Sequence, residues 1–232
     1  MVEQFSKLAP MIGDRGMEIL KQSRVLVAGL GGVGSFCAEA LVRCGVGTIG
    51  VMDSDQSQPS NLNRQLFALH STLGEYKVTS FQKRARDINP DVCVETYPLF
   101  LNRESKDQID VTSFNVVADC IDALVPKLNL ILSCLENDIP IVASTGAGFK
   151  LDPTKVKSGS IWETINDPLA HQMRKKLRRW GYGDTNFTVV YSTEKRQCTP
   201  DGTSVASIIT VTGTFGFTIA ATILSLLLET EK

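Results

Sequence analysis

The sequence predicts an α/β fold with a mostly parallel sheet, helices on both faces and an appended C-terminal segment. Two observations lead to this prediction. Strand-like and helix-like runs alternate through the first half of the chain, which is typical of parallel sheets. A glycine-rich stretch also separates the first apolar run from a helical pattern. The chain is expected to form a single domain over 1–232 with a soft boundary near residue 150, an N-terminal arm over 1–22 and an extension over 150–232.

The predicted elements follow one another in chain order. Short apolar runs are predicted strands, and longer segments with apolar residues at helical spacing are predicted helices. The first half contains predicted strands over 23–31, 48–55, 92–99, 114–122 and 139–148, separated by predicted helices over 33–46, 77–88 and 125–139. After residue 150 the alternation lapses, and the remaining features are a basic segment over 171–183, a strand over 187–194, a polar loop over 195–204 and an apolar helix over 210–228.

The stretch GLGGVG lies between the first predicted strand and helix. Its four glycines fit the pattern GxGxxG with one glycine added: Gly29, Gly31, Gly32 and Gly34. Such glycines permit a tight turn and let the backbone approach phosphates, which then face the positive end of the helix. Asp53 follows at the tip of the second predicted strand, where a carboxylate can bind ribose hydroxyls. The pattern predicts a Rossmann-like nucleotide site, but it does not choose among NAD, FAD and ATP.

Two cations after the second predicted strand favour ATP. Arg64 and Lys77 lie thirteen residues apart, and Asn61 and Gln65 accompany them. Attack of a carboxylate on the α-phosphate of ATP builds negative charge on that phosphate and on the departing pyrophosphate, which fixed cations stabilise. Hydride transfer to NAD has no such requirement. We therefore predict ATP, with NAD and simple surface charges as the alternatives.

Two aspartates, Asp119 and Asp122, lie where the predicted strand over 114–122 ends. Ligands of open parallel sheets bind at the carboxyl edge, and a carboxylate there can hold Mg²⁺ against phosphates. Asp122 is the predicted metal ligand. Asp119 stays open between a metal ligand and a cap of the following helix.

Composition excludes several function classes. Lys and Arg total 24 against 25 for Asp and Glu, so the net charge gives no nucleic-acid or membrane signature, any charged partner must be met by a local patch, and no DNA partner is expected. The six cysteines include no CxxC pair, so no zinc is expected, and they are typical of a reduced, cytoplasmic protein. Cys198, in the polar loop, is open between a reactive thiol and an ordinary cysteine.

The apolar run over 210–228 is expected to be a buried or subunit-contact helix, with a membrane span as the alternative.

A basic run close to the C-terminal third offers contacts for RNA. Five cations lie next to Trp180: Arg174, Lys175, Lys176, Arg178 and Arg179. Such cations can bind phosphates, and the indole can stack on a base. A solvated helix face is the alternative.

The motifs GxGGxG, DxD, SNLNRQ, a lysine at this spacing and CxD, in this order over residues 23–148, resemble the ubiquitin-activating-enzyme-like adenylating superfamily. The resemblance implies that ATP and Mg²⁺ are bound by the four glycines and Asp55, with Asp53 at the ribose, with Asn61, Arg64 and Lys77 at the phosphates, and with Asp122 at the metal. It implies that Arg64, Lys77 and Asp122 are the catalytic residues.

The second half resembles one branch, the tRNA threonylcarbamoyladenosine dehydratases, in the motifs DPLA at 167–170, YSTE at 191–194 and TGTFGF at 212–217. The resemblance implies that ATP activates the threonyl carboxylate of a modified adenosine beside the anticodon. The carbamoyl side then closes a ring with loss of water. The resemblance also favours RNA contacts for the basic run, and it implies that the extension over residues 150–232 lies on the side of the enzyme that binds the substrate. The alternatives are activation of the C-terminus of a ubiquitin-like or sulfur-carrier protein, and a non-catalytic nucleotide-binding homologue.

The resemblance also implies partners: tRNA as substrate, a second copy of the chain in a homodimer, and a sulfur-transfer partner. Members of the superfamily have arginines in the N-terminal arm that reach the nucleotide of the other subunit. Here Gln4 and Lys7 stand at those positions, which leaves Lys7 or Arg15 as the substitutes.

Overall fold

The computed structural model describes residues 3–102, 105, 108–197 and 206–229. Cys198 therefore lies outside the described residues. Seven strands form one sheet, in the order β3-β2-β1-β4-β5-β7-β6. The strands are β1 (Arg24–Ala28), β2 (Thr48–Met52), β3 (Cys93–Tyr97), β4 (Val116–Asp119), β5 (Ile141–Ser144), β6 (Val156–Ser160) and β7 (Thr188–Ser192). All neighbours are parallel except β6, which pairs antiparallel to β7.

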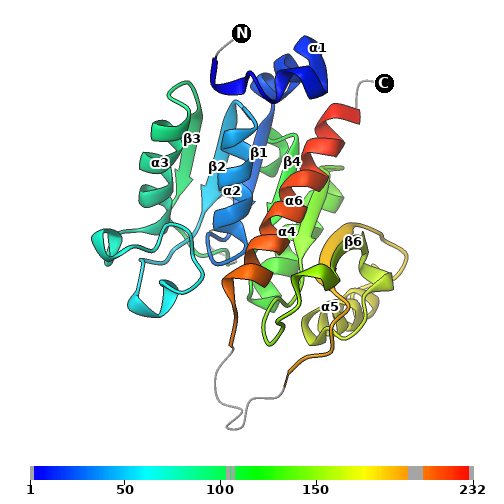
Figure 1. Ribbon diagram of the computed structural model, residues 1–232. Coiled ribbons are helices and arrows are strands. Elements are labelled where there is room, and N and C mark those ends of the chain that lie inside the picture. Colours follow the sequence, from blue (N-terminus) through cyan, green and yellow to red (C-terminus); the bar gives the residue numbers. More distant parts are fainter. Residues whose placement is uncertain (1–2, 103–104, 106–107, 198–205, 230–232) are drawn as a thin grey trace.

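Helices cover both faces of this sheet (Figure 1), as the sequence predicted. The helices are α1 (Ala9–Gln22), α2 (Gly34–Arg43), α3 (Lys77–Ile88), α4 (Leu124–Glu136), α5 (Pro168–Arg179) and α6 (Ile209–Glu229). One face packs against α1, α2, α3 and α6, and the other against α4 and α5. Because both faces are covered, the central strands are buried apolar runs rather than alternating ones.

The apolar helix α6 is part of the core. It is the one described helix that is long and apolar enough to cross a membrane. However, nine of its residues, including Phe215 and Ile219, are buried. A Cβ at Gly216 would lie 2.4 Å from the Val33 carbonyl oxygen, so glycine is required where α6 approaches α2. Figure 1 shows the two helices side by side on one face of the sheet.

Four elements differ from the predicted pattern. β6 was not predicted because VKSGS is a polar edge strand, which has no apolar alternation. Most of the basic segment predicted over 171–183 lies in helix α5, which begins earlier, at Pro168 after the capping side chain of Asp167, and ends at Arg179. The predicted strands over 48–55 and 114–122 end earlier, at Met52 and Asp119, because the chain leaves the sheet there.

Register brings the ends of three central strands level. Ala28 lies opposite both Met52 and Asp119 in the sheet. Therefore the glycine turn after β1, Asp53 after β2 and Asp122 after β4 all emerge at the same carboxyl edge. The order of connections reverses between β1 and β4, which is the usual ligand position in such sheets.

Candidate active site

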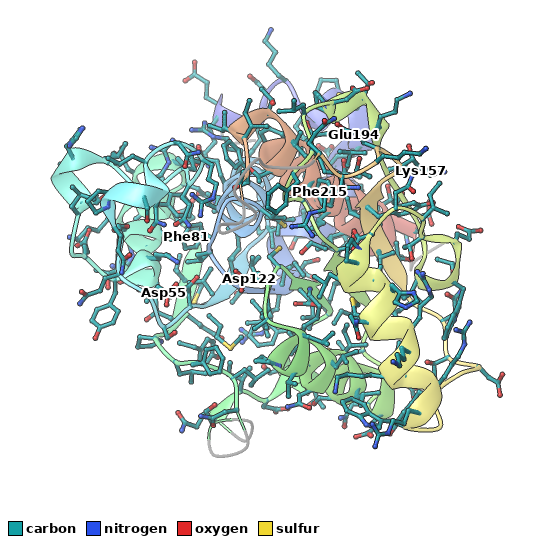
Figure 2. The ribbon with its side chains drawn as sticks, turned by 90° about the horizontal axis from the view of Figure 1, so that it is seen from below. Asp55, Phe81, Asp122, Lys157, Glu194 and Phe215 are labelled. Carbon is teal, nitrogen blue, oxygen red and sulfur yellow. The ribbon has the colours of Figure 1, made fainter. Side chains whose placement is uncertain are left out.

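A cavity of about 610 Å³ lies at this edge. Its volume is in the usual range for small-molecule sites, about 300–1,000 Å³. Nine of the ten predicted nucleotide and metal residues line it: Gly29, Gly31, Gly32, Asp53, Asp55, Asn61, Arg64, Lys77 and Asp122. Viewed from below, Asp122 lies near the middle of the molecule and Asp55 to its left (Figure 2). The structure therefore brings together residues that are far apart in the sequence.

The glycine turn fits closely against the end of β4. Gly29 has a φ of +91°, and a Cβ there would lie 2.8 Å from the Cys120 carbonyl oxygen. Gly34 is the predicted site residue that does not line the cavity. A Cβ at Gly34 would lie 1.7 Å from the Gly29 carbonyl oxygen, so this glycine serves the packing of α2 against the turn.

Asp53 is held by two main-chain donors. Its Oδ2 accepts a hydrogen bond from the Leu30 N–H at 2.7 Å, and its Oδ1 accepts one from the Asp55 N–H at 2.8 Å. The Asp53 side chain is only 10% exposed. These bonds connect the glycine turn after β1 to the end of β2.

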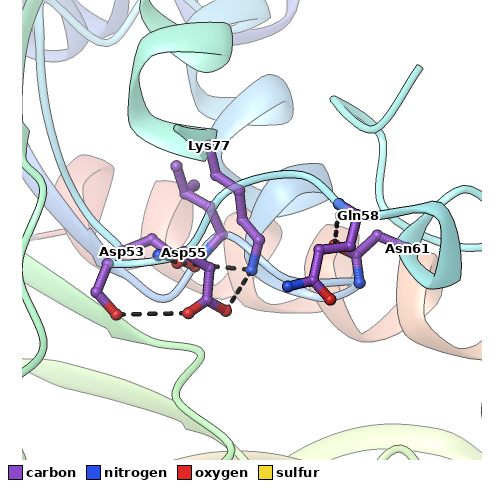
Figure 3. A network of polar contacts seen from close by, with 7 residues as sticks. Asp53, Asp55, Gln58, Asn61 and Lys77 are labelled. Carbon is purple, nitrogen blue, oxygen red and sulfur yellow. Dashed lines mark hydrogen bonds and ion pairs between the residues drawn. The ribbon is translucent and has the colours of Figure 1, made fainter. Parts of the chain in front are cut away.

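Lys77 lies beside both aspartates (Figure 3). Its Nζ is 2.8 Å from Asp55 Oδ2 and 3.5 Å from Asp53 Oδ1. Its backbone N–H donates to the Asp55 carbonyl at 3.0 Å, which fixes the start of α3. A buried cation is thereby held at the end of the cavity that contains the glycine turn.

Asn61 and Arg64 lie on the segment after β2. Asn61 Oδ1 accepts a hydrogen bond from the Gln58 N–H at 3.0 Å (Figure 3). The Arg64 Nη1 donates to the Ser60 carbonyl at 2.7 Å and to Asn63 Oδ1 at 2.9 Å. Within the described part of the chain, no carboxylate forms an ion pair with Arg64. Its charge is therefore not neutralised at the cavity wall.

Asp119 takes neither of the roles left open for it. It is fully buried, and its Oδ2 lies 2.6 Å from the Nζ of the equally buried Lys127. Burial raises the pKa of Asp119, whereas Lys127 and the Ile121 N–H oppose the rise. The N-cap of α4 is Ala123, which makes no side-chain cap. The Asp119–Lys127 ion pair is structural, and the sequence analysis did not identify Lys127.

Asp122 is exposed and lines the cavity. Among the residues that the structure describes, no group of three or more His, Cys, Asp or Glu side chains is placed to hold a metal ion. A metal here would have Asp122 as a protein ligand and would depend on nucleotide phosphates and water for the others, which is usual for Mg²⁺.

The five cations of the basic run do not form one surface. Arg174 turns inward and donates to the Ile161 and Thr164 carbonyls at 3.3 and 3.2 Å. Burial, and then the neighbouring Arg178, lower the pKa of Arg174. Lys176 lies 5.3 Å above the Trp180 ring, and Arg178 lies 4.8 Å above the Trp162 ring. Only Lys175 and Arg179 are exposed without a described ring or hydrogen-bond partner.

Residues 5–232 match the family model of the ThiF family. This chain belongs to the ThiF family. Its relatives in the ThiF family include the tRNA threonylcarbamoyladenosine dehydratase of Bacillus subtilis, which is 42% identical over 194 residues, covering 84% of this chain and 76% of the relative. The protein of the same name from Escherichia coli is 34% identical over 198 residues, covering 83% of this chain and 74% of the relative.

A solved structure of a similar protein contains a nucleotide. The crystal structure of the Escherichia coli tRNA N6-threonylcarbamoyladenosine dehydratase in complex with ATP superposes with a TM-score of 0.92 at 33% identity, covering 98% of this chain and 94% of that one. The predicted fold is confirmed, as is the resemblance to the adenylating superfamily and its dehydratase branch.

The end of the cavity opposite the glycine turn contains residues that the sequence analysis missed. Lys150 lines it and is buried, with its Nζ donating to the Asn166, Ser192 and Glu194 carbonyls at 3.2, 3.1 and 2.7 Å. Burial lowers the pKa of Lys150. The Arg196 guanidinium lies 3.9 Å from the centre of the Phe149 ring. Single cations in loops have no local signal, because only the fold brings them to the cavity.

Proposed function

We propose that this chain catalyses the ATP-dependent dehydration of threonylcarbamoyladenosine next to the anticodon of tRNA, through adenylation of the threonyl carboxylate. One observation carries the proposal. A single cavity joins the glycine turn, Arg64 and Lys77 at one end to Pro168 and Leu169, in the DPLA motif, at the other. The relatives named as dehydratases, and the related structure that contains ATP, support the same activity.

The nucleotide lies at the glycine turn in this proposal. Gly29, Gly31 and Gly32 let the backbone approach its phosphates, and Asp53 binds the ribose. Asp55 contributes by orienting Lys77, to which it is ion-paired. Asn61, Arg64 and Lys77 lie along the phosphates. The absence of a described carboxylate partner on Arg64 leaves its charge available for the α-phosphate and pyrophosphate.

The reaction proceeds in two steps. A threonyl carboxylate oxygen attacks the α-phosphorus, and the bond to the pyrophosphate oxygen breaks. The carbamoyl side then loses a proton and attacks the activated carbonyl carbon, and AMP leaves with the former carboxylate oxygen, so the substrate loses the elements of water overall. Both cations stabilise the charge of the first step, and the intramolecular second step needs mainly positioning.

Mg²⁺ is part of the proposal, with Asp122 as its protein ligand. The exposed carboxylate lines the cavity and has the hard oxygen donors that Mg²⁺ prefers. Bound there, the ion would neutralise phosphate charge. Asp122 would hold it on the α4 side of the cavity, opposite the cations of the β2 side.

The proposal extends to the wider setting of the enzyme. We include a homodimer and a cytoplasmic location. We also include RNA contacts on the outer surface of the basic run of α5, substrate binding by the extension over 150–232, and an N-terminal arm over 1–22. Static light scattering tests the homodimer. A sulfur-transfer partner stays a prediction, because no described contact bears on it.

ATP–pyrophosphate exchange separates this function from its alternatives. The chain is incubated with labelled pyrophosphate, ATP and, in turn, tRNA bearing threonylcarbamoyladenosine, tRNA lacking it and candidate carrier proteins. Exchange stimulated only by the modified tRNA is expected. Exchange stimulated only by a carrier would favour carrier activation, and ATP binding without any exchange would favour a non-catalytic homologue.

A further inference from the structure

We infer that a second cavity, next to the active site, binds a backbone phosphate of the RNA strand, so that the substrate nucleoside is recognised together with its phosphate. The inference rests on the proposed function. This cavity has a volume of about 430 Å³. Its lining includes four basic side chains and one carboxylate: His171, Arg174, Lys195, Arg196 and Asp167.

Both oxygens of the carboxylate in this lining accept hydrogen bonds from main-chain donors. Asp167 Oδ1 accepts from the Ala170 N–H at 2.9 Å, and Oδ2 accepts from the Gly146 N–H at 2.9 Å. The neighbouring Glu194 carboxylate accepts from the Leu151 and Asp152 N–H groups, both at 2.9 Å. Neither acid forms an ion pair with a cation of the cavity. Three cations, Arg174, Lys195 and Arg196, thus face the two acids Asp167 and Glu194, and the excess of positive charge favours an anion.

Two of the cations are positioned before any ligand arrives. Arg174 is anchored by the Ile161 and Thr164 carbonyls, and Arg196 by the face of the Phe149 ring. Within the described part of the chain, Lys195 and Arg196 have no carboxylate partner. Because little side-chain freedom is lost at the anchored arginines, binding there costs less than at mobile surface cations.

The position of this cavity indicates which anion it holds. Pro168 and Arg196 line both cavities, so an anion in the second lies beside a molecule in the first. The phosphates of ATP belong at the opposite end, with the glycine turn and Lys77. A nucleoside within RNA carries a phosphate on each side, close to its ribose. An RNA phosphate is thus the anion that the geometry favours.

The test uses substrates too small to reach the outer surface of α5. The full chain and ATP are given threonylcarbamoyladenosine as the free nucleoside, its 5′-monophosphate or its 3′-monophosphate, and kcat/KM for cyclisation is measured. One monophosphate should be preferred over the nucleoside by about tenfold, as expected for one charge-assisted contact. Lys195→Ala and Arg196→Gln should remove most of this preference.

Lys157→Ala is the matched control, because it removes the same charge from exposed Lys157 on β6, outside both cavities. It should keep the preference. Equal kcat/KM for all three substrates, or a preference that survives in both variants, would overturn the inference. A competition with inorganic phosphate gives a further test. If inorganic phosphate abolishes the preference for the monophosphate as effectively as a competing mononucleotide does, the inference is overturned, because the cavity would then bind a free anion.

Failure of the proposed function has a different signature, the absence of cyclisation with every substrate including tRNA. In that event, the salt dependence of tRNA binding decides the inference. The slope of log affinity against log salt should fall by about one when a phosphate contact is lost in Lys195→Ala. An unchanged slope would refute the contact.

Discussion

Lys77 Nζ lies 2.8 Å from Asp55 Oδ2, with the lysine side chain 6% exposed and the aspartate side chain 65% exposed. The buried ammonium group of Lys77 is thus oriented by the Asp55 carboxylate, whose charge is screened by solvent. The screened Asp55 neutralises Lys77 only partly, and the second acid, Asp53, lies farther away at 3.5 Å, so the lysine keeps attraction for an incoming phosphate. This relationship makes the two residues unequal in their expected effect on catalysis.

Lys77→Met should lower the rate of ATP–pyrophosphate exchange by about 10²–10³-fold, since it removes a fixed charge from the phosphates. Asp55→Asn keeps the backbone bond to Lys77 and should cost about tenfold or less. Exchange rates at saturating ATP measure both. An equal loss in the two variants would show that the aspartate is as important as the lysine and would refute this assignment.

Arg64→Ala should lower the rate of adenylation by about 10²-fold while changing the affinity for ATP much less, because the charge it stabilises grows in the transition state. Single-turnover kinetics and calorimetric titration of ATP separate the two effects. Asn63→Ala is the matched control, as it removes one hydrogen bond from the arginine and leaves its charge. A variant lacking Arg64 that restores modified nucleoside in deficient cells as well as the wild type does would exclude a catalytic role.

The buried Asp119–Lys127 pair should dominate local stability. Lys127→Met leaves a buried carboxylate without its cation and should lower the free energy of unfolding by about 3–5 kcal/mol. The double variant Asp119→Leu with Lys127→Met should recover most of that loss, because neither charge then remains buried. Urea denaturation measures each value. If the loss of unfolding free energy in the double variant equals the sum of the losses in the two single variants, the two residues do not act as a pair.

Glu39 should make stability depend on pH in the acid range. Burial raises its pKa, but hydrogen bonds from Arg84 and Arg43 outweigh this, and the pKa lies below the ordinary value of 4.5. The ion pairs therefore stabilise the fold above pH 4.5, and their contribution is lost as pH falls through the lower, folded-state pKa. Glu39→Gln should cost about 1–2 kcal/mol at pH 7. The difference from wild type should shrink on acidification, and a constant difference down to pH 3 would contradict the assignment.

The sequence predicts this fold well where the signals are local. Helix α3 occupies the predicted range 77–88, and the glycine turn lies between β1 and α2 as expected. Parallel strands place their carboxyl ends at one edge, so the gathering of Asp53, Arg64 and Asp122 in one cavity also follows from the order of elements.

Features that depend on distant partners were not predictable. β6 is a polar edge strand whose pairing with β7 is set by the tertiary fold. The role of Asp119 depends on Lys127, and the second cavity depends on a loop cation, Lys195, meeting the start of α5. Gly34 fits the phosphate-binding pattern, yet its neighbour is the Gly29 carbonyl rather than the cavity.

The most direct measurement is mass spectrometry of the nucleosides from tRNA that carries threonylcarbamoyladenosine, after incubation with the purified chain, ATP and Mg²⁺. The proposed function predicts conversion of that nucleoside to a cyclised form lacking one water, with AMP and pyrophosphate released in equal amounts and with conversion by Arg64→Ala slower by about 10²-fold. An unchanged nucleoside in the wild-type reaction, while ATP is consumed only when a carrier protein is added, would contradict it.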